Sequence, residues 1–320
     1  MPSSYELEYC SDPERWDDFV SLSPQGNIFC TSKFLNSLKF PADTVFVKRG
    51  EKALLGAVLL GAEPDLINPP MRYQGILFPR DPRDDLNHQR VRKNLEAVSY
   101  LLSELAQRNG VIRLSLHHSF EDLRSIQWFN FDKPKSARFE VHLRYTGILN
   151  LSQPNEFQDL FNSFRTARRQ DYKKAQKGGF YCEESCDGGI LNYLQEKTYN
   201  RQGMRASVPE RKLFARLAEK SLGMGFGRLM VCCDKNKNPV SASLFIYDSK
   251  CGYYLVGAND PKYRRFGTGT AVLVEQIRIC KEQGLAEVDF CGINSPDRGD
   301  FKTSFNAVPV PFFEAVWRKR

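Results

Sequence analysis

The sequence predicts an α/β (α+β) chain in which one helix–strand unit occurs twice. With 320 residues the chain is long enough for two domains, and its apolar fraction of 41% is that of a globular protein. The segments "LAQRNGVIRLSL" and "ICKEQGLAEVDF" match in helix end, glycine and strand. Their offset is 284 minus 110, or 174 residues, which favours two copies of one α/β unit over a solenoid.

The first copy is expected to contain a buried strand, a long helix and a second strand. The apolar, glycine-rich run 53–62 is too short to span a bilayer, so it predicts a strand or hairpin. Apolar residues recur at helical spacing over 91–108, and Asn109-Gly110 is a common helix stop. The alternation in "VIRLSL" then predicts a strand.

No linker-like stretch separates the copies, and we place the boundary near residue 147, between domains 1–146 and 147–320. Just after it, Ser152 is expected to cap a helix with a proline in its first turn. Aromatic and leucine side chains at helical spacing lead into the basic stretch 164–179. This pattern predicts an amphipathic helix with a basic far end.

The glycine turn "PKYRRFGTG" at 261–269 is the most informative feature of the second copy. Two predicted strands over 239–259 precede it, and a predicted helix from about Thr268 to a stop at Gly284 follows it. In this order, backbone N–H groups at the helix N-terminus converge on an anion. A plain entry of a loop into a helix would have the same pattern. The equivalent segment of the first copy, "RVRKNL" at 90–95, has no glycine, so phosphate chemistry is expected in the second copy.

Composition and side-chain chemistry narrow the functional classes. The net charge of +8 and the pI near 9.0 favour anionic partners such as nucleotides, phosphorylated substrates, RNA or a membrane surface. An acidic N-terminus without an apolar run predicts no secretory signal, and cysteines without metal-ligand spacing predict reduced thiols. His117 and His118 are expected on opposite faces of a strand, where they cannot hold one metal. We therefore expect a cytoplasmic protein with no metal and no membrane span.

Four motifs together resemble one known family. Arg264-x-x-Gly267-x-Gly269 is similar to the acyl-CoA pyrophosphate loop of the GCN5-related N-acetyltransferases. The segments "FRTARRQDYKKAQKGG", "VDFCG" and "FKTSF" resemble the Fem-like (non-ribosomal peptidyltransferase) branch and its acetyltransferase relatives. The resemblance covers residues 150–315 well and the first half only loosely. It implies two tandem acetyltransferase-like domains, each a mixed central sheet flanked by helices, with the active groove between them and a degenerate first domain on the acceptor side.

The resemblance also implies where an acyl donor binds. Arginines beside the glycine turn would contact phosphate oxygens. In the acetyltransferase fold the strand before the turn diverges from its neighbour, and a freed backbone N–H polarises the thioester carbonyl. The implied donor-binding residues are Arg264, Arg265, Gly267, Thr268, Gly269, Thr270, Leu255, Val256 and Gly257.

Three side chains are candidates for the chemistry itself. Lys302 lies in "FKTSF", where it either snorkels between aromatic side chains or stabilises the negative charge of a tetrahedral intermediate. Asp289 would orient or deprotonate the attacking amine, or lie at the surface. Tyr254 lies on the strand before the turn. For the acceptor, the resemblance implies contacts from Arg165 and Arg169, although a solvated charged face has the same composition.

These observations predict an N-acyltransferase that moves an acyl group from acyl-CoA to the amine of a nucleotide-linked amino sugar or similar cell-envelope precursor. The amine would attack the thioester directly. One alternative is an aminoacyl-tRNA-dependent Fem-type transferase acting on a peptidoglycan precursor. We favour acyl-CoA because residues 180–225 leave no room for the long helical arm that many tRNA-dependent Fem-type enzymes carry. Another alternative is a non-catalytic protein that binds RNA or a membrane surface.

Overall fold

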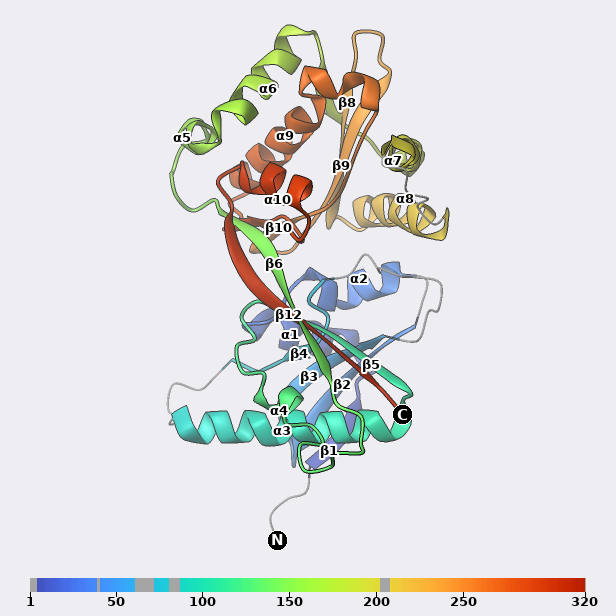
Figure 1. Cartoon of the computed structure of the whole chain (residues 1–320), viewed down its shortest axis with the longest axis vertical. Coiled ribbons are helices and arrows are strands. Elements are labelled where there is room, and N and C mark those ends of the chain that lie inside the picture. Colours follow the sequence, from blue (N-terminus) through green and yellow to red (C-terminus); the bar gives the residue numbers. More distant parts are fainter. Residues whose placement is uncertain (1–4, 39–40, 61–71, 81–86, 202–207, 320) are drawn as a thin grey trace. The chain divides into compact units, whose positions relative to one another are not determined.

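The computed structural model describes residues 5–38, 41–60, 72–80, 87–201 and 208–319. The chain divides into two compact units (Figure 1). Unit 1 contains the described residues of 1–63, 71–144 and 311–320, and unit 2 contains those of 145–310. The end of the chain therefore belongs to unit 1, which a single boundary near residue 147 does not anticipate. None of the described helices combines the length and the apolar character needed to cross a membrane.

Unit 1 is built around an antiparallel four-stranded sheet packed against a long helix. The sheet order is β1 (Tyr5–Tyr9), β2 (Ala42–Arg49), β3 (Lys52–Leu60), β4 (Ile76–Leu77). Its other elements are α1 (Pro13–Leu22), η1 (Ile28–Cys30), α2 (Ser32–Ser37), α3 (Asn87–Arg108), β5 (Val111–Leu116) and α4 (Arg124–Gln127). Buried side chains such as Val47 of β2, Leu55 of β3 and Leu102 of α3 share one core. The predicted strand, long helix and second strand of the first copy are thus confirmed over their described residues.

The second half of the chain contributes most of a mixed eight-stranded sheet. Its strands are β6 (Glu140–Asn150), β7 (Tyr181–Glu184), β8 (Gly227–Cys233), β9 (Pro239–Tyr247), β10 (Cys251–Asn259), β11 (Glu287–Asp289) and β12 (Val308–Arg318). Its helices are α5 (Phe157–Ser163), α6 (Thr166–Lys177), α7 (Gly188–Arg201), α8 (Val208–Gly223), η2 (Pro261–Phe266), α9 (Thr268–Glu282) and α10 (Pro296–Thr303). The strand order is β5-β12-β6-β11-β10-β9-β8-β7, and β10 and β11 are parallel.

Helices cover both faces of this sheet in unit 2 (Figure 1). On β9, Phe245 shares a core with Leu273 of α9, whereas the adjacent Leu244 shares one with Leu191 and Leu194 of α7. Because neighbouring strand residues point to opposite faces, α9 and α7 lie on opposite faces. The helices α7 and α8 contain 14 and 16 residues, and α7 packs on the sheet. This pair fills the segment in which no long helical arm was predicted.

The expectation that Ser152 caps a helix is wrong. Helix α5 begins only at Phe157, with Glu156 as its N-cap residue. The backbone N–H of Ser152 instead donates to the side-chain oxygen of Asn150 (2.8 Å). This local turn competes with helix formation, as asparagine side chains commonly do.

The amphipathic stretch before and within 164–179 is two helices, not the single helix that the periodicity predicts. The chain is extended at Phe164 (ψ 148°), between α5 and α6. There the backbone N–H of Arg165 donates to the carbonyl of Ser304 (2.9 Å). The break therefore ties the basic segment to the end of α10.

Candidate active site

The glycine turn joins η2 to α9 through a left-handed residue. Gly267 has φ +77°, and a Cβ atom there would lie 2.3 Å from the backbone carbonyl oxygen of Asp171 on α6. A Cβ atom at Gly269 would lie 2.5 Å from the side-chain oxygen of Asn259. Both glycines are therefore required by close packing, and Gly267 also by its backbone conformation.

The start of α9 has no side-chain cap. Gly267 is its N-cap residue, so no side chain caps the helix. The first N–H groups of a helix have no carbonyl partner within it, and with the helix dipole they favour a negative charge. Arg264 and Arg265 are exposed on η2 immediately before the cap.

The two threonines of the turn face inward. Thr268 is fully buried, and its Oγ1 accepts a hydrogen bond from the hydroxyl of Ser241 (2.6 Å). Thr270 is 3% exposed, and its hydroxyl contacts Arg168 and Asp171 of α6, each at 3.4 Å. Both residues are buried, and the N–H of Thr270 already donates to the carbonyl of Gly267 (3.0 Å), so the two threonines hold the turn in place.

The pairing of β10 with β11 ends just before the predicted thioester site, because β11 itself ends at Asp289. The parallel register pairs Tyr253 with Asp289 and ends there, although β10 continues to Asn259 with β9 on its other side. A register shift between Tyr254 and Val256 marks a bulge at this point. Residues 255–257 therefore lie beyond the end of the β10–β11 pairing, and bulges of this kind commonly redirect a strand next to a site.

Tyr254 and Lys302 lie close together where the β10–β11 pairing ends. The Tyr254 ring stacks on Phe245 (centroids 5.4 Å apart), and the Nζ of Lys302 lies 5.2 Å from the Tyr254 ring centroid. A Cβ atom at Gly257 would lie 2.0 Å from the Tyr254 hydroxyl, so glycine makes room for that hydroxyl. Burial raises the pKa of Tyr254 to about 12, which keeps the hydroxyl protonated at neutral pH.

The Lys302 ammonium is held by the backbone that follows β11. Its Nζ donates to the carbonyls of Phe290 (2.6 Å) and Gly292 (2.8 Å). A lysine that merely snorkels would place its ammonium in water. Here the cation is fixed against two carbonyl groups.

Asp289 lies inside the fold and shapes the same backbone segment. It is 1% exposed and accepts hydrogen bonds from the hydroxyl of Thr146 and from the N–H of Cys291 (2.6 Å). The N–H of Gly292 donates in turn to Thr146 Oγ1 (3.1 Å). Cys291 and Gly292 have φ of +52° and +107°, so the carboxylate supports a turn that ordinary residues rarely adopt.

The basic helix and the "FKTSF" element pack against each other. The guanidinium of Arg165 pairs with Asp300 (2.9 Å), and that of Arg168 lies 5.0 Å from the Phe301 ring centroid. Rings on either side of this contact, Phe164 and Phe305, have centroids 5.4 Å apart. Through Thr270, Arg168 also links this pair to the start of α9. All four motifs singled out in the sequence therefore belong to one region of unit 2.

Arg165 and Arg169 do not have equal surroundings. The Arg165 side chain is 52% exposed and bound to Asp300. Arg169 donates to Thr166 Oγ1 (3.0 Å), and its Nε is buried without a hydrogen-bond partner among the described residues. The Nε of Arg168 is in the same situation. Arg168 was missed in the sequence, although it lies three residues from Arg165 and so on the same side of the helix.

The expectation for the paired histidines is wrong in its geometry. Strand β5 ends at Leu116, so His117 and His118 lie after the strand, and their ring centroids are 4.0 Å apart. His117 is engaged by Ser119 Oγ (2.8 Å). Within the part of the chain that the structure describes, no cluster of three or more His, Cys, Asp or Glu side chains is placed to hold a metal ion.

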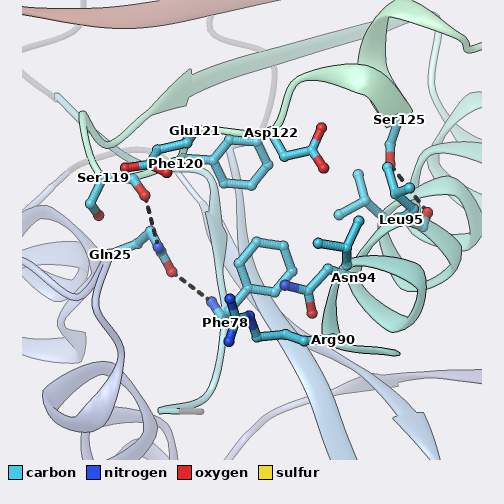
Figure 2. Close-up of a pocket in the computed structure, with 12 residues that line it drawn as sticks. Gln25, Phe78, Arg90, Asn94, Leu95, Ser119, Phe120, Glu121, Asp122 and Ser125 are labelled. Atoms are coloured by element: carbon cyan, nitrogen blue, oxygen red, sulfur yellow. Dashed lines mark hydrogen bonds between the residues drawn. The ribbon is translucent and has the colours of Figure 1, made fainter. Parts of the chain in front are cut away.

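Unit 1 contains a separate cavity of about 240 Å³. Figure 2 shows Arg90 and Asn94 of α3 beside the Phe78 ring, and Phe120 on the opposite side of that ring. The two rings are stacked, with centroids 5.6 Å apart. Gln25 braces this wall by accepting the N–H of Phe78 (3.0 Å). None of the predicted donor, acceptor or catalytic residues lines this cavity.

Comparisons with known proteins agree with this picture. A family model for the acetyltransferase (GNAT) domain matches residues 162–303. FemX has a TM-score of 0.68 at 16% identity, with 96% of each chain covered. A tandem GNAT protein from the clavulanic acid biosynthesis pathway has a TM-score of 0.57 at 12% identity, with 98% of each chain covered. A comparison with curated proteins finds no match.

A third similar structure is a GCN5-related glucosamine N-acetyltransferase region of a fungal multi-domain β-N-acetylglucosaminidase. Its TM-score is 0.51 at 11% identity, covering 99% of this chain and 38% of that one. At such identities these structures establish the fold, and the family model identifies the domain. Residues 162–303 thus form an acetyltransferase (GNAT) domain of an acyltransferase, and the chain as a whole has a fold similar to those of FemX and of a tandem GNAT protein.

Proposed function

We propose that this acyltransferase uses acyl-CoA and acylates the amine of a nucleotide-linked amino sugar or a similar cell-envelope precursor. The observation that carries the proposal is the left-handed Gly267 turn, which begins a helix without a side-chain cap. It directly follows the part of β10 that has left β11. An uncapped helix start and a strand end that is not paired with β11 thus occur together on one continuous segment.

The residues of the turn fit a diphosphate. The first N–H groups of α9 would bind phosphate oxygens, and Arg264 and Arg265 would add charge-assisted hydrogen bonds. Gly267 and Gly269 would let the backbone approach the ligand closely. In this assignment Thr268 and Thr270, which are buried, keep the turn rigid.

Acyl-CoA supplies a thioester with an electrophilic carbonyl carbon. We assign the backbone N–H groups of Leu255, Val256 and Gly257 to the thioester oxygen, where they stabilise developing negative charge. The neutral amine attacks the thioester carbon and forms the new C–N bond in a tetrahedral intermediate. The C–S bond breaks as this intermediate collapses, and the departing thiolate receives the proton that the amine loses. The protonated Tyr254 hydroxyl, next to Gly257, is the hydrogen-bond donor assigned to this step.

Lys302 and Asp289 act in different ways in this proposal. We assign Lys302 to electrostatic stabilisation of the tetrahedral intermediate, since its ammonium is fixed beside Tyr254. Asp289 is a positioning residue. Its carboxylate is buried and already accepts two hydrogen bonds, so it supports the turn that holds Lys302 and is poorly placed to deprotonate an amine.

For the acceptor we retain Arg165 and Arg169, with unit 1 as the acceptor-side domain. The net charge of +8 favours an anionic acceptor, and the buried Nε of Arg169 has an unused donor. The similarity to a glucosamine N-acetyltransferase region supports an amino sugar. The alternative, an aminoacyl-tRNA-dependent Fem-type transferase acting on a peptidoglycan precursor, is supported by the fold similarity to FemX.

Thermal shift with three ligands tests the proposal: CoA, a nucleotide-linked amino sugar and bulk tRNA. A ligand that binds only the folded protein raises its unfolding midpoint. We expect CoA and the amino sugar to raise it, and thiol release to follow when acyl-CoA and amino sugar are combined. A shift with tRNA and none with CoA would favour the alternative. No shift with either donor would overturn both.

A further inference from the structure

The segment after α4 presents two aromatic side chains to solvent. Trp128 is 52% exposed and Phe131 is 60% exposed. Phe129, between them in sequence, points inward and packs edge-on against Phe139 and Trp317, with centroids 5.5 and 6.3 Å apart. The segment is therefore anchored by one ring and displays two others.

Backbone and side-chain hydrogen bonds stabilise the conformation of this segment. The N–H of Phe131 donates to the carbonyl of Trp128 (2.9 Å), and that of Lys133 donates to Asn130 (3.0 Å). The Asn130 side chain bridges to the carbonyl of Ala137 (2.7 Å) across the base of the turn. The two solvent-exposed aromatic rings are thus part of a turn that hydrogen bonds stabilise.

Cations surround the two rings. The guanidinium of Arg124 lies 5.5 Å from the Trp128 ring centroid, and that of Arg138 lies 5.2 Å from that of Phe131. Lys133 and Lys135 are exposed beside them. Residues 124–138 contain these four cations and one acid, Asp132, and Arg124 is also paired with Asp122 (2.6 Å) just before this segment. We call Arg124, Trp128, Phe131, Lys133, Lys135 and Arg138 the aromatic–basic surface.

We propose that the aromatic–basic surface docks unit 1 on an anionic phospholipid bilayer. Tryptophan and other amphipathic rings favour the headgroup level of a membrane, and exposed apolar groups rimmed by charge mark interaction sites. Lysine and arginine next to them are attracted to anionic lipids. Two such signals together are what reversible membrane association requires.

Single-stranded nucleic acid is the competing partner, since bases stack on aromatic rings beside cations. Stacking of a base uses a whole ring face, however, and an arginine already lies over one face of Trp128 and one face of Phe131. Insertion into a headgroup layer needs only the outer edge of each ring. The geometry therefore favours the lipid surface.

Tryptophan fluorescence offers a direct reporter, because Trp16 and Trp317 are 1% and 5% exposed. Full-length protein is mixed with vesicles of phosphatidylcholine containing about one third phosphatidylglycerol, and sedimentation is measured in parallel. We expect a blue shift of the emission and sedimentation that added salt weakens. Vesicles of phosphatidylcholine alone should give neither.

Variants distinguish binding by the aromatic–basic surface from nonspecific binding to vesicles. Lys133→Gln with Lys135→Gln should lower binding by about fivefold for each charge, and Phe131→Ala should lower it by at least about tenfold. The control Tyr181→Ala with Lys235→Gln, which changes an exposed ring and an exposed lysine in unit 2, should bind like the parent. All variants should keep the parent's unfolding midpoint.

Three results would overturn the proposal. They are no binding to the anionic vesicles, binding that the surface variants leave unchanged, and binding of a single-stranded RNA oligonucleotide without binding of vesicles. The outcome is independent of the acyl donor, because catalysis on soluble substrates is not involved.

Discussion

The two long helices α3 and α9 end in the same glycine-and-strand pattern but begin differently. Subtracting 174 from 264 and 267 gives Arg90 and Lys93, and both lie inside α3, which starts at Asn87. In unit 2 the corresponding residues form η2 and the left-handed Gly267 before α9 starts. Equivalent segments of the two copies are therefore helical in unit 1 and a turn in unit 2.

This difference decides what each unit can bind. In α3 the N–H groups of Lys93 and its neighbours lie within the helical hydrogen-bond ladder, so they cannot serve an anion. In unit 2 the helix starts at Thr268, and its first N–H groups have no carbonyl partner in the helix. Unit 1 instead lines a cavity with the side chains of Arg90 and Asn94 (Figure 2). In the proposed function, one glycine position thus separates a backbone site for an anion from a pocket lined by side chains.

The largest loss of activity is expected at Lys302. Lys281 makes the same kind of contacts and serves as its control. Both ammonium groups donate to two backbone carbonyls, Lys281 to those of Leu151 (2.8 Å) and Pro154 (2.7 Å). Lys302→Met should lower kcat/KM by about 100-fold, the usual loss when one stabilising donor is removed. Lys281→Met should cost similar stability and leave turnover intact. Equal activity of the two variants would show that Lys302 is structural.

Gly267→Ala should weaken CoA binding next most strongly. The added Cβ meets the Asp171 carbonyl and sits at φ +77°, so the turn must shift away from the backbone geometry proposed to bind phosphate, and we expect a loss of about 2 kcal/mol of binding free energy, or roughly thirtyfold in Kd. Titration calorimetry with CoA measures it. Lys93→Gly, at the equivalent place in unit 1, should cost about 1 kcal/mol of stability as a glycine inside a helix and leave the Kd unchanged. An unchanged Kd in Gly267→Ala would remove the turn from the donor site.

Asp289→Asn distinguishes positioning from proton abstraction. As a positioning residue, Asp289 should lose about tenfold in kcat when changed, with the shape of the pH profile kept. Thr146→Val, which removes its hydroxyl partner, should have a similar effect. A general base would behave otherwise: Asn would abolish activity and remove the acidic limb of the profile, while the valine variant stayed active.

The smallest effect contrasts the two glycines that end the long helices. Gly284 has φ +75°, whereas Gly110 is not left-handed, and neither has an atom within 4 Å of an added Cβ. Gly284→Ala should therefore lower the free energy of unfolding by about 1 kcal/mol, and Gly110→Ala should leave it unchanged or raise it slightly. Chemical denaturation measures both. Equal losses would mean that the two helix ends are more alike than their backbones indicate.

Sequence patterns anticipated the elements best where the periodicity was long. The helix over 91–108, the strand "VIRLSL" and the helix from Thr268 needed only local spacing and a glycine stop. The break at Phe164 was not predictable in this way, because it is fixed by a hydrogen bond to Ser304, about 140 residues away. The prediction for the histidine pair was wrong for a smaller reason: the strand ends at Leu116, two residues before His118.

The site followed the same rule. The glycine turn was readable since glycine reports a backbone requirement in the sequence itself. The burial of Asp289 and the two carbonyls that hold Lys302 were not readable, because both depend on how β6, β11 and α10 come together. Arg168 belongs to the same class, with contacts on both α9 and α10.

The repeat provides the most direct test of the central claim, that the acyl donor binds at the unit 2 turn. Arg264 and Arg90 occupy equivalent positions, one before the left-handed turn and one inside α3. CoA is titrated into the parent protein and into Arg264→Ala and Arg90→Ala. We predict that Arg264→Ala weakens CoA binding by about tenfold, as loss of one charge-assisted contact does, while Arg90→Ala binds like the parent. Unchanged binding in Arg264→Ala, or a loss confined to Arg90→Ala, would contradict the account.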